Sequence, residues 1–196
     1  MKLGKLFISA AIAAAFAPSA FAQGTGEVIQ RDVNQQQRIE QGLQSGQLTT
    51  REAGKLEGEE ARIDKMEKNA LKDGKLSPQE SARINRAQDQ VSRDIYREKH
   101  DAQVGNPNSA SSQRMQADVQ RNINQQQRIE QGVKNGSLTN REVGKLENGQ
   151  AHVDRTEARA ARNGKVGPNE QARIQQAENK QSRRIYREKH DDQKRH

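Results

Sequence analysis

Apolar residues recur every three or four positions along most of the chain, which is the spacing of one face of an α-helix. In residues 78–100 this face holds Ile84, Ala87, Val91 and Ile95. Residues 50–72 show the same spacing, and no stretch alternates as a strand would. The pattern therefore predicts three helices, over 27–44, 50–72 and 78–100. The first is rich in Gln and poor in apolar residues, so we expect it either to pack weakly or to find a partner in another chain.

The chain contains this three-helix pattern twice. The motifs NQQQRIEQG and IYREKHD each occur two times, 90 residues apart, and residues 31–103 align with 121–193 without insertions. Between the copies, VGNPNSASSQ is rich in Gly, Asn, Pro and Ser, which predicts a flexible linker. We therefore expect an all-α protein, with two tandem copies of a three-helix antiparallel unit joined by a flexible linker. The expected parts are a first repeat at 23–103, a linker at 104–118 and a second repeat at 119–196.

The stretch KDGKLSPQE, residues 72–80, allows two interpretations. Asp73, Gly74 and Glu80 have the spacing of the second half of an EF-hand loop, but the earlier ligand positions of such a loop carry no carboxylate. Alternatively, Gly74 ends one helix in the left-handed conformation, and Ser77 with Glu80 forms a capping box that starts the next. The same frame recurs at three other corners, around Gly46, Gly136 and Gly164. We favour the helix corner, and Asp73 and Glu80 stay as a candidate cation site.

The N-terminus has the features of a secretory signal peptide. Lys2 and Lys5 precede a short apolar run, and an A-x-A cleavage site ends at Ala22. Residues 1–22 are therefore expected to be a cleaved signal peptide, and the mature protein to be periplasmic. The chain has no cysteine, so export brings no disulfide and no Cys-ligated metal.

Composition argues against an enzyme. The chain is 30% hydrophobic, 3% aromatic and 31% charged, and it lacks Trp, which leaves little material to line a deep substrate pocket. No catalytic motif is present, and we expect no enzymatic activity. The formal charge of +8 favours anionic partners such as envelope surfaces or acidic unfolded chains. So few aromatic side chains argue against nucleic acid, because there is little on which bases could stack.

Two His-Asp pairs follow the predicted third helices. Imidazole and carboxylate groups are ligands of transition metals, so these pairs are candidate metal sites. Alternatively, the histidines complement the negative end of the helix dipole. The candidate metal ligands from the sequence are His100, Asp101, His190, Asp191, Asp73 and Glu80.

Gly54 and Gly144 lie early in the predicted second helix of each copy, where a glycine costs about 1 kcal/mol relative to alanine. Either the two helices cross another helix closely at these points, or a weak first turn is tolerated.

The segments LTTRE (48–52), LSPQE (76–80) and LTNRE (138–142) resemble the L-T-x-x-Q motif of the Spy and CpxP group of periplasmic stress chaperones, with Glu in place of the family's Gln. That resemblance implies a small, exported, all-helical protein that binds other proteins during stress. We therefore expect a non-enzymatic periplasmic binding or stress protein, chaperone-like toward unfolded or envelope-associated partners, and we allow for a homo-oligomer. The alternative is a periplasmic metal-binding protein that holds a divalent ion at its His-Asp pairs or EF-hand-like loops.

Overall fold

The computed structural model describes residues 20–193, and their side chains from Gly24 onward. This part of the chain is all-α, as predicted, with six α-helices, two short 3-10 helices and no strand. The elements are α1 (Ala20–Ser45), α2 (Thr50–Ala70), η1 (Leu71–Asp73), α3 (Pro78–Lys99), α4 (Ala110–Lys134), α5 (Asn140–Ala160), η2 (Ala161–Asn163) and α6 (Pro168–Lys189). The predicted signal peptide lies outside the described residues except for its last three, which begin α1. No helix among residues 20–193 is apolar over enough of its length to cross a membrane.

The corners between helices have the local chemistry that the sequence predicts. Gly74 has a φ of 90°, and the equivalent glycines of the other three corners also have left-handed backbones. At the start of α3, the Ser77 side chain accepts a hydrogen bond from the Glu80 backbone, and the Glu80 carboxylate accepts one from the Ser77 backbone. Thr49 and Thr139 form the same capping box at α2 and α5. The 72–80 segment therefore forms a helix corner.

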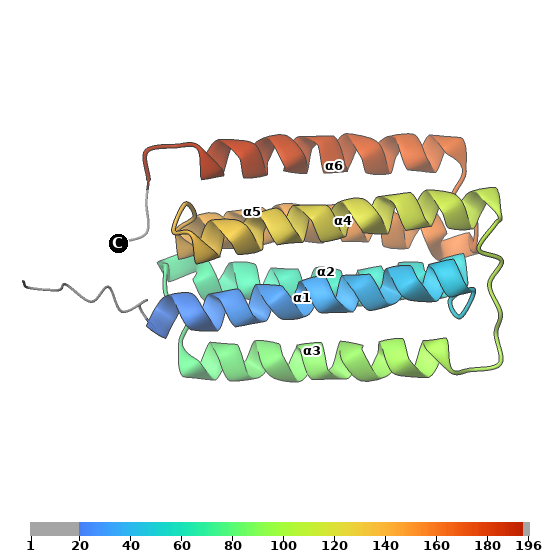
Figure 1. Ribbon diagram of the computed structural model, residues 1–196, viewed down its shortest axis with the longest axis horizontal. Helices are drawn as coiled ribbons and strands as arrows, with labels where there is room; N and C mark the ends of the chain where they lie inside the picture. The colour runs from blue at the N-terminus through green and yellow to red at the C-terminus, as the bar shows by residue number, and fades with distance from the viewer. Residues whose placement is uncertain (1–19, 194–196) are drawn as a thin grey trace, which may run out of the picture.

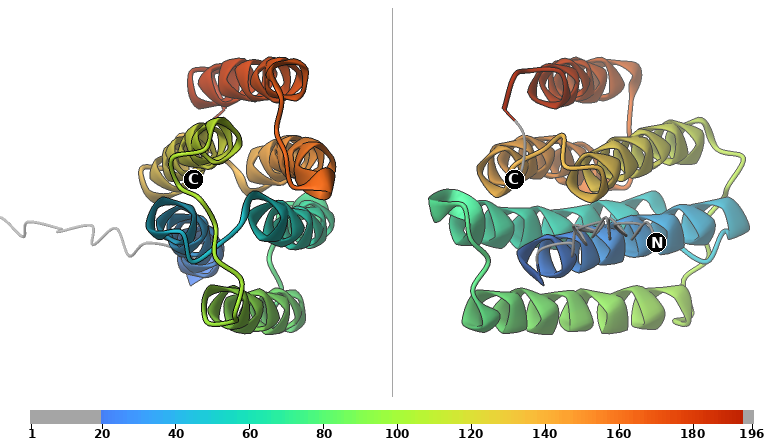
Figure 2. Two further views of the ribbon diagram at one scale, coloured as in Figure 1. Left: turned by 90° about the vertical axis from the view of Figure 1, so that its right-hand side faces the viewer. Right: turned by 60° about the vertical axis from the view of Figure 1, so that its left-hand side comes forward.

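The two copies pack into one bundle. The most extensive contacts between helices join α2 to α5 and α1 to α4, so they cross from one copy to the other. Figure 1 shows all six helices lying along one long axis, with α1 antiparallel to α4 and α2 antiparallel to α5. The end-on view in Figure 2 shows α1 and α2 in one layer, α4 and α5 in the next, and α3 and α6 on opposite outer sides. The prediction of two units on a flexible tether is therefore not confirmed, because the copies share a central four-helix bundle.

The segment between the copies is shorter than predicted. Helix α4 begins at Ala110, so residues 110–118 of the predicted linker are helical, and Met115 among them is fully buried. Ser109 caps this helix by accepting a hydrogen bond from the Ser112 backbone. The Gly105 backbone donates to the Gly46 carbonyl oxygen at 2.8 Å, which fixes the connection to the first corner. A Ser-rich sequence suggested a linker, but here it supplies a helix cap.

The Gln-rich first helix is central, contrary to both arrangements expected for it. Helix α1 packs on α4 of the same chain, and its Ile29, Ile39 and Leu43 are fully buried. Its Gln35 and Gln36 are also buried, because their amides find hydrogen-bond partners inside the bundle. A low apolar content therefore did not indicate weak packing here.

Close helix crossing explains Gly54 and Gly144. A Cβ atom on Gly54 would lie 2.4 Å from the Cβ of Ala161, and one on Gly144 would lie 3.1 Å from the Cβ of Leu71. Both contacts are made between the start of one second helix and the end of its counterpart from the other copy. These glycines let the backbones of α2 and α5 approach, and this approach brings the side chains described next into one cluster.

Candidate metal centre

The interior of the four-helix bundle is acidic. Glu57 and Glu67 of α2 are fully buried, and so are Glu147 and Glu157 at the equivalent positions of α5. These four belong to a set of eight buried carboxyl groups of α1, α2 and α5 that we call the carboxylate core. Its members are Asp32, Glu57, Glu60, Asp64, Glu67, Glu147, Asp154 and Glu157. Asp118 of α4 and Glu178 of α6 are as deeply buried, but Arg121 faces both of them, so they are not counted in the core. Buried carboxyl groups are rare in proteins unless they are paired or bind a metal.

The core is organised as two clusters related by the 90-residue repeat. In the Glu67 cluster, Asp64 and Glu67 of α2 meet Glu147 of α5. In the Glu157 cluster, Asp154 and Glu157 of α5 meet Glu57 of α2. Within each cluster one oxygen from each residue lies within 4.8 Å of the others. Two oxygens that bind one ion at about 2.4 Å can be no further apart than about 4.8 Å, so each cluster has the dimensions of a cation site.

The two clusters adjoin at the α2–α5 interface. Asp64 of the first cluster and Asp154 of the second lie close enough to repel each other when both are ionised, so a proton or a cation between them is favoured. Each cluster takes ligands from both copies, and the clusters together form one continuous acidic centre.

Glutamine side chains from α1 and α4 orient one glutamate in each cluster. Gln36 donates its amide N–H to Glu57 Oε2 at 2.9 Å, and Gln126 donates to Glu147 Oε2 at 3.0 Å. In both cases the other carboxylate oxygen, Oε1, is buried without a hydrogen-bond partner, and so is the amide oxygen of the glutamine. Metal-binding carboxylates are commonly oriented by such hydrogen bonds, which leave an oxygen available for the ion.

No basic side chain neutralises the core. In the part of the chain that the structure describes, none of the eight carboxyl groups forms an ion pair with Lys, Arg or His. Arg31, next to Asp32 in sequence, pairs with Asp89 on α3 instead. Glu67 is the clearest case, because it is fully buried and neither of its carboxylate oxygens accepts a hydrogen bond from an N–H or hydroxyl group. Its contacting neighbour is another acid, Asp32.

Burial raises the pKa of every member of the core. The pKa of Glu57 rises to about 7 and that of Glu147 to about 8, chiefly because burial disfavours the charged form. The pKa of Asp32 rises to about 7 for the same reason, although a hydrogen bond from Gln88 opposes the shift. The pKa values of Glu60, Asp64 and Glu67 are raised well above the usual range, mainly by burial and secondly by repulsion from neighbouring carboxylates. Asp154 and Glu157 are raised by the same two causes.

The free-energy cost of burying these carboxylates indicates that the core contains neutralising protons or cations. An unpaired buried carboxylate costs several kcal/mol, and a whole domain is stable by only about 5–15 kcal/mol. Eight ionised carboxylates would therefore unfold the bundle. At neutral pH the core must take up protons or bind cations, and the oxygens without partners are placed to do the second.

The chemistry of the donors restricts which cation fits. Every candidate ligand in the core is a carboxylate or amide oxygen, and no histidine or methionine lies in either cluster. Such ligands suit hard ions such as Ca²⁺, Mn²⁺, Mg²⁺ or a lanthanide, and do not favour Cu⁺. The residues present therefore fit a hard cation.

The His-Asp pairs predicted from the sequence lie at the surface, away from the core. The His100 ring stacks on Tyr96 at a centroid distance of 4.1 Å, and its Nδ1 lies 2.7 Å from the Tyr96 carbonyl oxygen. His190 has the same two contacts with Tyr186. Both histidines follow the last turn of an outer helix, as the dipole interpretation requires, and metal binding there stays a prediction.

The carboxylates predicted beside these histidines have other neighbours. Asp101 lies in a group with Glu52 and Glu98 that has the dimensions of a metal site, and Asp191 lies in the equivalent group of the second copy, with Glu142 and Glu188. However, the Glu98 carboxylate is 2.6 Å from Lys55 Nζ. The carboxylates of Glu52 and Glu142 are used in capping boxes. Lys55 and Lys145 therefore give each of these groups a cationic partner, which no member of the core has within the described residues.

The predicted cation site at Asp73 and Glu80 is occupied by local hydrogen bonds. Asp73 Oδ1 accepts from the Lys75 backbone at 2.9 Å, and Glu80 Oε2 accepts from the Ser77 backbone at 3.0 Å. Both contacts belong to the helix corner.

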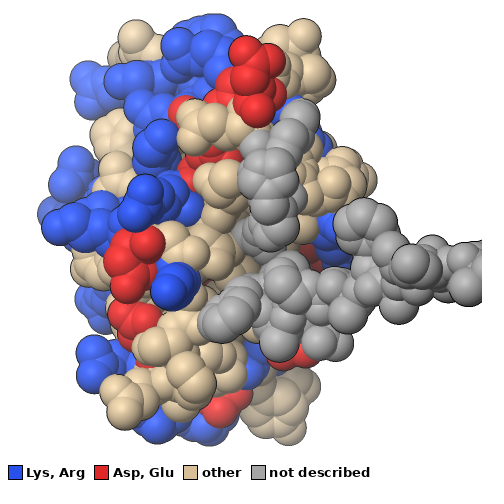
Figure 3. Space-filling view, turned by 90° about the vertical axis from the view of Figure 1, so that its left-hand side faces the viewer, with Lys and Arg blue, Asp and Glu red and all other residues tan. Residues whose placement is uncertain are grey.

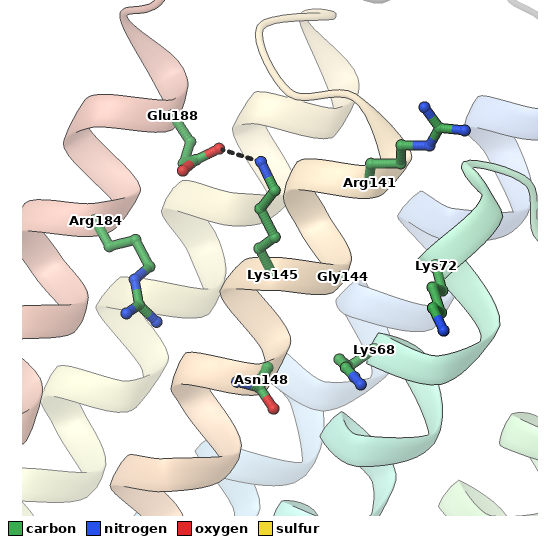
Figure 4. A pocket seen from close by; sticks show the side chains of 8 residues that line it. All are labelled: Lys68, Lys72, Arg141, Gly144, Lys145, Asn148, Arg184 and Glu188. Atoms are coloured by element: carbon green, nitrogen blue, oxygen red, sulfur yellow. Dashed lines mark ion pairs between the residues drawn. The ribbon is translucent and has the colours of Figure 1, made fainter.

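Basic side chains lie outside the bundle, in contrast to the core. Figure 3 shows Lys and Arg gathered along one side of the end of the molecule. A surface groove of about 520 Å³ lies at this end, between α2, α5 and α6. Figure 4 shows the residues that line it, of which only Glu188 is acidic, and Glu188 pairs with Lys145 at 3.6 Å. The cationic lining residues are Lys68, Lys72, Arg141, Lys145 and Arg184.

Comparison with known proteins does not add to this assignment. No protein family, characterised protein or solved structure was found to match the chain. The interpretation of the centre therefore depends on its geometry.

The sequence contains a signal for the core that our prediction did not use. Glu57, Glu60, Asp64 and Glu67 are spaced by three, four and three residues, which places them on one helix face. That face also carries buried apolar side chains such as Ile63. Three of these four acids recur 90 residues later, and acidic residues repeated on an apolar face indicate a buried carboxylate cluster.

Proposed function

We propose that this protein binds hard metal cations inside its four-helix bundle, at the two clusters of the carboxylate core. The observation that carries the proposal is Glu67, a fully buried carboxylate that accepts no hydrogen bond from an N–H or hydroxyl group. One of its oxygens lies within 4.8 Å of oxygens from Asp64 and Glu147. A cation at this position would neutralise the cluster and give these oxygens a partner.

Metal binding is the alternative function expected from the sequence, but its proposed site is the carboxylate core and not the His-Asp pairs or the EF-hand-like loops. Because metal binding to such a site is coupled to folding, the ion would stabilise the packing of α2 on α5. The export predicted from residues 1–22 would expose the protein to extracellular Ca²⁺. Extracellular modules that bind Ca²⁺ typically have dissociation constants of about 10⁻⁴–10⁻³ M.

Chaperone-like activity has less support. The exposed large hydrophobic residues in the described part of the chain are Tyr96, Val104 and Tyr186, and both tyrosine rings stack on histidines. They do not form a broad apolar surface for unfolded clients, so this activity stays a prediction.

The test is to strip the purified protein with a chelator and measure cation binding directly. Native mass spectrometry against Ca²⁺, Mn²⁺, Mg²⁺, Zn²⁺ and Tb³⁺ should show stoichiometric adducts with at least one of the hard ions. An ion at 100 times its dissociation constant adds about 2.7 kcal/mol to the free energy of unfolding, so the melting temperature should rise by about 5–10 °C.

Matched variants identify the site. Glu67→Gln combined with Glu157→Gln should abolish the adduct, because it removes one carboxylate from each cluster. Glu27→Gln makes the same chemical change at an exposed position of α1 and should have no effect. Adducts that survive the double variant, or a wild type that binds none of the five ions at millimolar concentration, would contradict the proposal.

A second candidate function is supported by the basic groove. Five cationic side chains around one groove, with a single acid among its lining residues, favour an anionic surface as partner. Phosphate-rich lipid vesicles should bind the protein in a salt-dependent way, and Lys68→Glu with Lys72→Glu should weaken this binding without changing cation binding. Equal binding to neutral vesicles would exclude this function.

A further inference from the structure

The two clusters differ although the repeat makes them equivalent in backbone position. Asp32 of α1 corresponds to Asn122 of α4, and Glu60 of α2 corresponds to Gln150 of α5. At both positions the acid is in the first copy and the amide is in the second. The reverse exchange occurs at Gln88 of α3 and Glu178 of α6, where Arg121 pairs with the acid. The consequences for the clusters can be followed contact by contact.

Amide groups partly satisfy the Glu157 cluster. Asn122 donates its N–H groups to Glu157 Oε2 at 2.8 Å and to Asp154 Oδ1 at 3.3 Å. Gln150 donates to the same Asp154 oxygen at 3.3 Å and to the Asn122 amide oxygen at 3.0 Å. The carboxylate oxygens of this cluster that lack a partner are therefore only two, one on Glu57 and one on Glu157.

The Glu67 cluster has carboxyl groups where the other has these amides. Asp32 contacts Glu67, and Glu60 lies close enough to Asp32 for the two to repel each other. Glu60 is also near Glu57 and Asp154, so it borders both clusters. With Asp32 and Glu60 included, this side of the core contains five carboxyl groups and the other side contains three. Its oxygens without a partner are Asp32 Oδ2, Glu60 Oε1, Asp64 Oδ2, both Oε atoms of Glu67, and Glu147 Oε1. The further acids beside the Glu157 cluster, Asp118 and Glu178, face Arg121.

We propose that the core binds two hard cations in sequence, and that the Glu67 cluster with Asp32 and Glu60 fills first and more tightly. This inference rests on the proposed function. The first site has more anionic oxygens and fewer competing N–H donors, both of which favour a cation over the empty state. The contact between Asp64 and Asp154 places the second ion next to the first, so the charge of the first opposes the second. The two affinities should differ by at least about tenfold.

The natural difference between the copies supplies matched variants for the test. Asp32→Asn gives the Glu67 cluster the residue that the other cluster already has. Asn122→Asp makes the reciprocal change. Both sites lie inside the same fold, and both exchanges preserve side-chain size closely.

The chelator-treated full chain and both variants are titrated with Tb³⁺, followed by its luminescence, and with Ca²⁺, followed by calorimetry. The wild type should bind two ions in two resolved steps. Asp32→Asn should weaken the first step by at least about tenfold and change the second by less than about threefold. Asn122→Asp should strengthen the second step and bring the two affinities closer. Circular dichroism under chelation checks that each variant keeps its helical content, and a variant that fails this check is replaced by Glu60→Gln, for which the same loss is expected.

The outcomes separate this inference from the proposed function. Two equal steps, a single bound ion, or an effect of Asp32→Asn on the weaker step alone would overturn the order of binding and leave cation binding established. Failure of the wild type to bind either probe would overturn both.

Discussion

Replacing Glu147 by Gln should change the stability of the protein in opposite directions with and without a cation. Glu147 is fully buried, accepts one hydrogen bond from Gln126, and has a pKa raised to about 8 by burial. The ordinary pKa of this carboxyl group is 4.5, so between pH 4.5 and 8 the metal-free folded state holds a proton that the unfolded state has lost. Stability therefore falls as pH rises through this window, and Glu147 contributes to that fall.

The size of the effect follows from the shift. At pH 7 the cost is about two and a half pKa units at 1.36 kcal/mol each, or about 3 kcal/mol. Gln is neutral at every pH, and its amide oxygen can still accept the hydrogen bond from Gln126. In the presence of a chelator, Glu147→Gln should therefore be up to about 3 kcal/mol more stable than the wild type at pH 7. This corresponds to a melting temperature about 6–12 °C higher.

Saturating cation should remove this advantage. Glu147 is a ligand in the Glu67 cluster, so the variant loses part of the binding energy that the wild type gains from the ion. The assay is thermal unfolding followed by circular dichroism at pH 7, with EDTA or with Tb³⁺, and with Glu27→Gln as the exposed control. A variant that melts below the wild type in EDTA would refute the reasoning, because it would mean that the buried carboxylate does not destabilise the metal-free fold.

Three further predictions use the same stability and binding assays. In EDTA, the melting temperature of the wild type should fall between pH 5 and pH 8, because the carboxylate core loses protons over this range, and a flat or rising profile would contradict the raised pKa values. Gly54→Ala should lower the free energy of unfolding by about 1–3 kcal/mol, because its Cβ would overlap Ala161. The control Gly26→Ala makes only ordinary contacts and should not destabilise the protein. Equal melting temperatures of the two variants would exclude the close crossing. His100→Ala with His190→Ala should leave Tb³⁺ titrations unchanged, and a lost binding step would return the metal site to the helix ends.

The helices and their corners could be predicted because their causes are local. The left-handed backbone of Gly74 and the capping box of Ser77 with Glu80 depend on residues a few positions apart. The packing of one copy on the other could not be predicted in this way. An apolar stripe shows that a helix face is buried but does not show which helix covers it, and here the partner of α2 is 90 residues away.

The core was missed because charged residues are usually exposed. Lys and Glu alternate closely along α2, and this pattern is typical of a solvated surface. What distinguishes Glu57, Asp64 and Glu67 is their position on the face that also carries Ile63. The Gln-rich first helix gave a second signal, since Gln36 is a donor that a buried carboxylate needs. Neither signal is strong alone, and the close approach of α2 and α5 that joins them is a property of the folded chain.

The separation of charge in this molecule also changes how its net charge should be interpreted. A formal charge of +8 includes the buried acids, none of which has a buried Lys or Arg beside it in the described residues, so the solvent-facing surface is more basic than the sequence suggests. Each cluster takes one glutamate from one copy and an Asp-x-x-Glu pair from the other. A bound cation would therefore join the two copies, and neither copy alone contains a complete cluster. The repeat is then a requirement of the site, because a single copy could build it only by pairing with a second one around a two-fold axis.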